Sequence, residues 1–134
     1  MTERLQKLFL FSIPLFIVHG LEEIFSGFYI IDSHVNFMFG YLVTLPNIQA
    51  LFLLFQIMLG LMLIISYLLL LGTRWQLRLM CILGIVFVYE FHHLYKAVDV
   101  GGYYPGLITA IPLYIVGFLF WKELFKNIKT YHGN

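Results

Sequence analysis

The chain has 134 residues, of which 61% are hydrophobic and 11% are charged, and its mean hydropathy is +0.90. Soluble globular domains carry about 25% charged residues, so this composition is typical of a protein that lies in lipid. The formal net charge of +1, without a continuous basic stripe, excludes a nucleic-acid partner. The single cysteine, Cys81, excludes an intramolecular disulfide.

Hydropathy predicts four membrane-spanning helices, at about residues 8–31, 47–71, 77–98 and 103–121. Helices are expected because an open strand could not satisfy its backbone hydrogen bonds in lipid. Turn-forming residues mark the breaks: Asp32 and Pro46 around the first loop, Gly72 in the second, and Gly101 and Gly102 in the third. The prediction is therefore an all-α fold, a four-helix transmembrane bundle forming one domain over residues 1–134.

The basic residues predict the orientation of the bundle. Of the eight, only Lys96 lies near the far side, and the others share one side: Arg4, Lys7, Arg74, Arg78, Lys122, Lys126 and Lys129. The positive-inside rule then puts both termini in the cytoplasm, and we expect a multi-pass protein of a bacterial plasma membrane. The aromatic loop at about residues 32–45 is expected to lie in the membrane interface, as an aromatic belt more than as a lid.

Ionisable residues gather on two of the predicted helices. His19, Glu22 and Glu23 are spaced i, i+3 and i+4 on the first helix, which puts them on one face. On the third helix Glu90 and His93 share a face, and His92 is turned by about 100° from His93.

Depth decides whether these two groups can meet. A rise of about 1.5 Å per residue brings both to one level, in the middle and outer half of the bilayer. Gln56 on the second helix and Thr109 on the fourth are predicted at a similar height, so each helix would contribute a polar group to one layer.

Ionised carboxylates in hydrocarbon are unfavourable unless they are paired, so the predicted cluster calls for protons, a cationic side chain or a metal. Imidazole and carboxylate are the ligands of zinc and iron, and Glu-x-x-His on facing helices is typical of dimetal bundles. We therefore expect one or two divalent ions, zinc or iron. The candidate metal ligands are His19, Glu22, Glu23, Glu90 and His93. Glu23 and His92 are the candidate catalytic residues, with His92 a general base or a further ligand.

The run from His19 to Glu23, His-Gly-Leu-Glu-Glu, resembles the signature of the HXXEE-motif family of integral membrane proteins. The resemblance extends over nearly the whole chain. A second helical histidine, His92 or His93, and the segment from Tyr104 to Ala110 are similar to the later blocks of that family. The resemblance implies this fold and this site, and it does not identify a reaction.

The leading hypothesis is a membrane-embedded metalloenzyme, a hydrolase or an oxidase, acting on a lipid or another hydrophobic molecule. One alternative is a metal-free isomerase or hydrolase with glutamate and histidine as acid and base. Another is a protein that transports or binds protons or metal ions, although the cytoplasmic halves of the predicted helices are almost purely apolar. Besides the lipid bilayer and a hydrophobic substrate, the expected partners include a second copy of the chain, as a homodimer.

Overall fold

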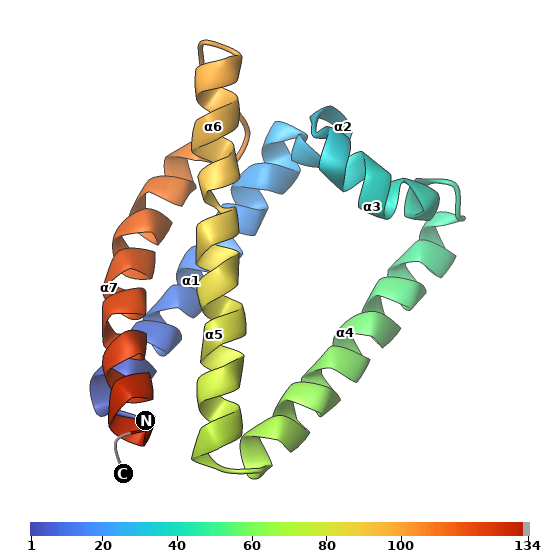
Figure 1. Cartoon of the computed structure of the whole chain (residues 1–134). Helices are drawn as coiled ribbons and strands as arrows, with labels where there is room; N and C mark the ends of the chain where they lie inside the picture. Colours follow the sequence, from blue (N-terminus) through green and yellow to red (C-terminus); the bar gives the residue numbers. More distant parts are fainter. Residues whose placement is uncertain (133–134) are drawn as a thin grey trace.

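The computed structural model describes residues 1–132 and all of their side chains except those of Tyr29, Val43, Leu51 and His132. Within this part of the chain every regular element is a helix (Figure 1). The elements in chain order are α1 (Glu3–Ser26), α2 (Phe28–Ile31), α3 (Ser33–Val43), α4 (Asn47–Leu70), α5 (Thr73–Tyr89), α6 (Phe91–Asp99) and α7 (Leu107–His132).

Four runs of helix are long and apolar enough to cross a membrane: α1, α4, the nearly continuous α5–α6 run from Thr73 to Asp99, and α7 as far as Tyr131. This confirms the prediction of an all-α fold with four membrane-crossing helices. The two termini lie at one end of the molecule, and α2 and α3 lie at the other (Figure 1).

The first helix is shifted from its predicted range of 8–31. It begins at Glu3, because the Thr2 side chain accepts a hydrogen bond from the N–H of Leu5 as an N-cap. It ends at Ser26, because Gly27 has φ 75°, a left-handed conformation that closes the helix. Hydropathy follows apolar content and not backbone turns, so it joined α1 and α2 into one span.

The fourth helix also differs from its predicted range of 103–121. Gly106, with φ 85°, precedes the first residue of α7, so Tyr103 and Tyr104 lie in the loop. The helix runs past Trp121 to His132, because the polar residues that end the apolar stretch are still good helix formers.

α7 packs against both α1 and α5–α6, and this contact forms the main apolar core. The buried members of that core are Leu5, Leu77, Met80, Phe87, Leu113, Val116, Phe120 and Leu124. Over the described residues α1 and α5 meet through side chains, such as the rings of Phe16 and Phe87, whose centroids are 5.0 Å apart. The first and third spans thus meet through their side chains, and α7 packs against both of them.

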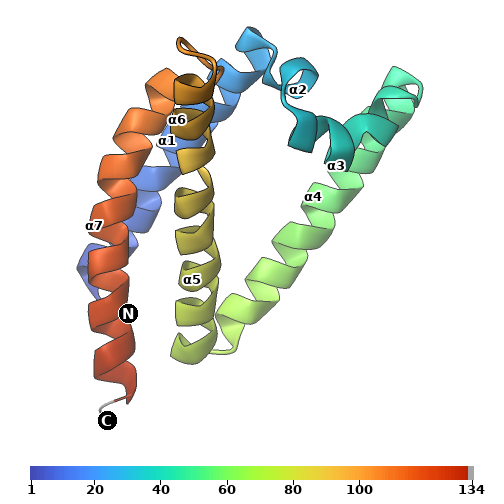
Figure 2. The same ribbon diagram turned by 45° about the horizontal axis from the view of Figure 1, so that its top comes forward.

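α4 stands apart from this core. It contacts α3 and α5, and none of its described side chains is buried. Both views show α4 leaning away from the other long helices (Figures 1 and 2). Three of the four membrane-crossing helices therefore share a core, and α4 is attached by its two ends.

The predicted interfacial loop at residues 32–45 is mostly helical. Asp32 caps α3, since its Oδ1 accepts hydrogen bonds from the backbone N–H groups of His34 at 2.9 Å and Val35 at 3.1 Å. The segment α2–α3 thus forms a short helical connection from the end of α1 to the start of α4 (Figure 2).

The contact between α5 and α7 depends on a glycine. Trp121 Nε1 donates a hydrogen bond of 3.0 Å to the carbonyl of Gly84, and a Cβ at Gly84 would lie 2.7 Å from Trp121 Cζ2.

We predict that Gly84→Ala lowers the free energy of unfolding by about 1–3 kcal/mol, because the indole must move. Thermal unfolding in detergent would measure this. Gly40→Ala on α3 is the matched control, because nothing lies within 4 Å of a Cβ there. Equal losses in both variants would contradict the prediction.

Candidate metal centre

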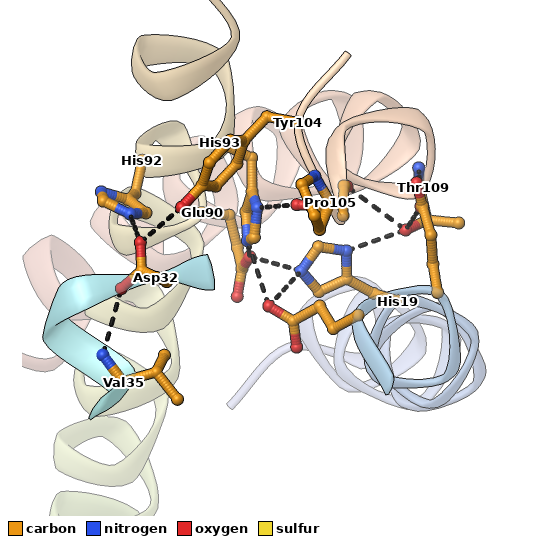
Figure 3. A network of polar contacts seen from close by, with 12 residues as sticks. His19, Asp32, Val35, Glu90, His92, His93, Tyr104, Pro105 and Thr109 are labelled. Carbon is orange, nitrogen blue, oxygen red and sulfur yellow. Dashed lines mark hydrogen bonds and ion pairs between the residues drawn. The ribbon is translucent and has the colours of Figure 1, made fainter. Parts of the chain in front are cut away.

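Four side chains meet between α1, α6 and the start of α7 (Figure 3). His19 Nε2 lies 2.8 Å from Glu90 Oε2 and 3.7 Å from Glu23 Oε1. His93 Nε2 lies 3.4 Å from Glu90 Oε2 and 3.3 Å from Glu23 Oε1. His19, Glu90 and His93 are buried, whereas the Glu23 side chain is 25% exposed and forms the open side of the cluster.

Local helix geometry brings the four side chains together. His19 and Glu23 are one turn apart on α1, and Glu90 and His93 are one turn apart across the junction of α5 and α6. Glu90 is the junction residue, and the hydroxyl of Tyr114 on α7 donates a 2.9 Å hydrogen bond to its carbonyl. The Glu90 side chain remains free to face the histidines.

The tautomer of His93 follows from its hydrogen bond. Its Nδ1 lies 2.6 Å from the carbonyl oxygen of Pro105. A carbonyl oxygen only accepts, so Nδ1 carries the proton. In the neutral ring Nε2 then has a lone pair, and this atom faces Glu23 and Glu90.

The tautomer of His19 follows from a longer chain of hydrogen bonds. The hydroxyl of Thr109 donates to Glu22 Oε2 at 2.5 Å, so its oxygen accepts from His19 Nδ1 at 2.8 Å. His19 Nε2 therefore carries a lone pair as well. It is fully buried and makes no hydrogen bond, although Glu90 Oε2 is only 2.8 Å away.

With both rings neutral, the centre of the cluster contains acceptors that face one another without a donor between them. Two imidazole lone pairs and two carboxylates repel each other unless a cation or additional protons lie among them. His19, Glu90 and His93 each offer a ligand atom, and these atoms lie within 4.8 Å of one another. Imidazole with carboxylate suits zinc, iron or manganese, so the residues present fit a divalent metal ion.

The backbone at Gly106 closes one side of this cluster. A Cβ at this position would lie 2.6 Å from His93 Cε1 and 2.9 Å from His19 Cε1, and its φ of 85° also favours glycine. The turn before α7 therefore packs directly on both imidazole rings.

Glu22 was a predicted ligand, but its carboxylate lies outside the cluster. Its oxygens accept hydrogen bonds from the backbone N–H groups of Thr109 at 2.8 Å and Ile108 at 3.3 Å, and from the Tyr103 hydroxyl at 2.8 Å. The first N–H groups of a helix lack partners within it and attract negative charge. Glu22 therefore caps α7, and through Thr109 it orients His19.

His92 was predicted as a general base or ligand, and it too lies outside the cluster. Its Nε2 is 2.7 Å from Asp32 Oδ2, and its ring stacks on that of Tyr89 with centroids 5.8 Å apart. Asp32, His34 and His92 form a second group whose ligand atoms lie within 4.8 Å. The Asp32 oxygens already accept four hydrogen bonds, two from backbone N–H groups, one from His92 and one from Tyr104, so this group is satisfied without an ion.

Asp32 instead fastens three segments to one another: α3, which it caps, His92 on α6, and Tyr104 in the loop before α7. Burial opposes the charge on its carboxylate, but the hydrogen bonds from His92, Tyr104 and the backbone outweigh it and hold the pKa of Asp32 below its ordinary value of 3.8. Burial and the bond to Asp32 raise the pKa of Tyr104.

The sequence pointed to Asp32 only as a helix break, and to Tyr104 only as part of the segment that resembles the family. Asp32 lies 60 residues from His92 and 72 from Tyr104, and no local spacing reveals such contacts.

Two further polar residues do not join the cluster. Gln56 was expected at its level, but it is exposed on α4 and has no hydrogen-bond partner among the described residues; Lys96, near the far side, pairs with no described carboxylate. The polar layer thus contains groups from three helices, including Thr109 of α7.

Fold and site together define a helical protein with four potential membrane-crossing helices and a buried His/Glu cluster that fits a metal. The sequence model of the family described as "Protein of unknown function with HXXEE motif" matches residues 10–121, so the chain belongs to that family. His19, Glu22 and Glu23 are the named positions of the motif. Comparison with curated proteins and with solved structures finds no match.

The different surroundings of the two adjacent glutamates lead to a prediction for metal-free protein. Glu22→Ala removes the acceptor of several hydrogen bonds at the start of α7 and is expected to cost about 1.5–3 kcal/mol. Glu23→Ala removes one of the mutually repelling acceptors, so it should leave the stability unchanged or increase it. Thermal unfolding in detergent with a chelator present measures both. An equal loss in the two variants would be incompatible with these surroundings.

The lowered pKa of Asp32 predicts acid sensitivity. Because the folded-state pKa lies below 3.8, ionised Asp32 stabilises the fold fully above pH 3.8, and this contribution is lost as the pH falls below that value. The stability difference between wild type and Asp32→Asn should therefore shrink between pH 6 and about pH 2, as measured by denaturant unfolding. Asp99→Asn, at an exposed position, is the control and should keep the pH dependence of wild type. A difference that does not change with pH would refute the assignment.

Proposed function

We propose that the chain is a membrane-embedded metalloenzyme that binds a divalent ion, zinc or iron, through His19, Glu90 and His93. The observation that carries this proposal is His19 Nε2, a buried nitrogen 2.8 Å from a carboxylate oxygen without a hydrogen bond. A nitrogen lone pair and a carboxylate at this separation are the arrangement of two ligands around a shared cation.

Charge favours a single ion. Two neutral imidazoles with the carboxylates of Glu23 and Glu90 carry a charge of about −2, which one divalent ion neutralises and two would exceed. The three buried side chains are the ligands, and Glu23 stands at the exposed edge, 3.3 Å from His93 Nε2. Three protein ligands with a neighbouring carboxylate are typical of catalytic metal sites.

In such a site the bound ion would supply Lewis-acid activation, and iron would add redox chemistry, so the reaction belongs to the hydrolase or oxidase class. Glu23 is the residue that takes up and returns the proton, because its carboxylate is partly exposed whereas that of Glu90 is buried. Glu22 and Thr109 keep the His19 ring in the tautomer that a metal requires.

The surroundings favour a lipid or another hydrophobic substrate. On the side of the cluster that faces the termini, the apolar core fills the space between the helices. On the opposite side, the loop from Tyr103 to Gly106 covers the cluster. The open side at Glu23 lies on α1, a helix that exposes apolar side chains such as Leu21, Ile24 and Phe25 on its other faces. A substrate would therefore arrive sideways from the bilayer of what we propose is a bacterial plasma membrane.

Two alternatives are less well supported. A metal-free acid–base enzyme would place a proton on His19 Nε2, and this atom makes no hydrogen bond with Glu90. A transporter would need polar groups along the whole path, and the described core between the cluster and the termini is mostly apolar, with Ser12, Glu123 and Asn127 as its buried polar residues.

The test is elemental analysis of protein purified in detergent. Wild type is expected to carry about one zinc or iron per chain, and His19→Ala and Glu90→Ala should lose it, because each removes a buried ligand. Glu22→Gln should bind the metal about 10–100-fold more weakly, since it disturbs only the orientation of His19.

Circular dichroism of each variant serves as the control for folding. The proposal fails if folded wild type carries no more metal than the His19 and Glu90 variants.

A further inference from the structure

α4 carries a polar group whose surroundings the monomer does not explain. Gln56 lies nine residues after the start of α4, about 14 Å along the helix, too deep for its side chain to reach water. It is exposed, and no partner for its amide is found among the described residues.

Apolar side chains on α4 can face lipid without cost, but an amide in hydrocarbon is unfavourable until its donor and acceptor are paired. No hydrogen bond joins Gln56 to another described residue, and among the described elements α4 contacts only α3 and α5. The partner must therefore come from outside this chain.

Gln56 belongs to a continuous row along α4, which we call the α4 seam. Its members are Gln49, Leu53, Gln56, Gly60, Leu63 and Tyr67. They are spaced alternately by four and three residues, the heptad spacing of paired helices. Leu53, Leu63 and Tyr67 are 37%, 59% and 61% exposed, and nothing lies within 4 Å of a Cβ at Gly60, so another helix can approach closely there.

We propose that the α4 seam binds the same seam of a second copy of the chain. Two copies inserted in the same orientation bring their α4 helices together in parallel, so the two Gln56 residues lie at equal depth. An amide both donates and accepts, and it can therefore pair with its own copy across a twofold axis. α4 contains no charged residue that would oppose this contact.

This pairing is independent of the metal centre, since no residue of the α4 seam belongs to the His/Glu cluster. It also accounts for the position of α4, which is attached only by its ends and leaves its sides free (Figure 1). Hydrogen bonding between amides, together with close packing at glycine, is what drives helices to associate in lipid.

The first experiment measures the monomer–dimer equilibrium of the full chain by sedimentation in detergent. Wild type should dimerise, Gln56→Leu should raise the dissociation constant roughly tenfold, and Gln56→Asn should largely restore it by keeping the amide. Unchanged metal content and helix content are expected in Gln56→Leu, because α4 buries no described side chain. A monomeric wild type, or a dimer indifferent to Gln56→Leu, overturns the proposal.

The second experiment tests the contact by disulfide cross-linking in liposomes, in a Cys81→Ser background. Leu63→Cys lies on the α4 seam and should form a dimer band on oxidation, because paired Cβ atoms there come within disulfide range. Ile65→Cys, turned about 200° away, is the matched control and should not. Equal cross-linking at both positions, or more at position 65, would show that another face or another partner covers α4.

Discussion

The bond from Thr109 to Glu22 is the interaction on which the rest of the centre depends. By accepting N–H groups at the start of α7, the Glu22 carboxylate holds that helix against α1. Because it accepts the hydrogen bond that the Thr109 hydroxyl donates, the threonine oxygen is left to accept from His19. One carboxylate thus sets both the position of a helix and the protonation of a ring, and the lone pair on His19 Nε2 is the result.

Part of this arrangement follows from the sequence alone. Helical spacing brought His19 and Glu23 to one face of α1, and Glu90 and His93 to one face at the start of α6, and the rise per residue brought both pairs to one depth. What spacing cannot tell is which of two adjacent glutamates faces the second pair. Glu22 and Glu23 differ by about 100° around the helix. The position of α7 decides which of the two carboxylates binds the N–H groups of α7 and so does not face Glu90 and His93.

The packing of the helices was less predictable than their existence. Hydropathy recognises segments that are stable in lipid, and it found all four, but apolar side chains are equally stable against lipid and against another helix. Nothing in the apolar run of α4 therefore indicated that it would stand apart. The hydrogen bonds of Asp32 to His92 and Tyr104 were not predicted for another reason: these partners lie 60 and 72 residues further along the chain.

The contact of the Gly106 backbone with both imidazole rings links the outside of the molecule to its interior. The turn that carries Gly106 is continuous with the loop after α6, which reaches the end of the protein opposite the termini (Figure 1). Because no side chain stands between this backbone and the two rings, a displacement of the loop would move both imidazole rings at once. The loop at this end of the protein and the buried His/Glu cluster are in this sense mechanically coupled through a single peptide unit.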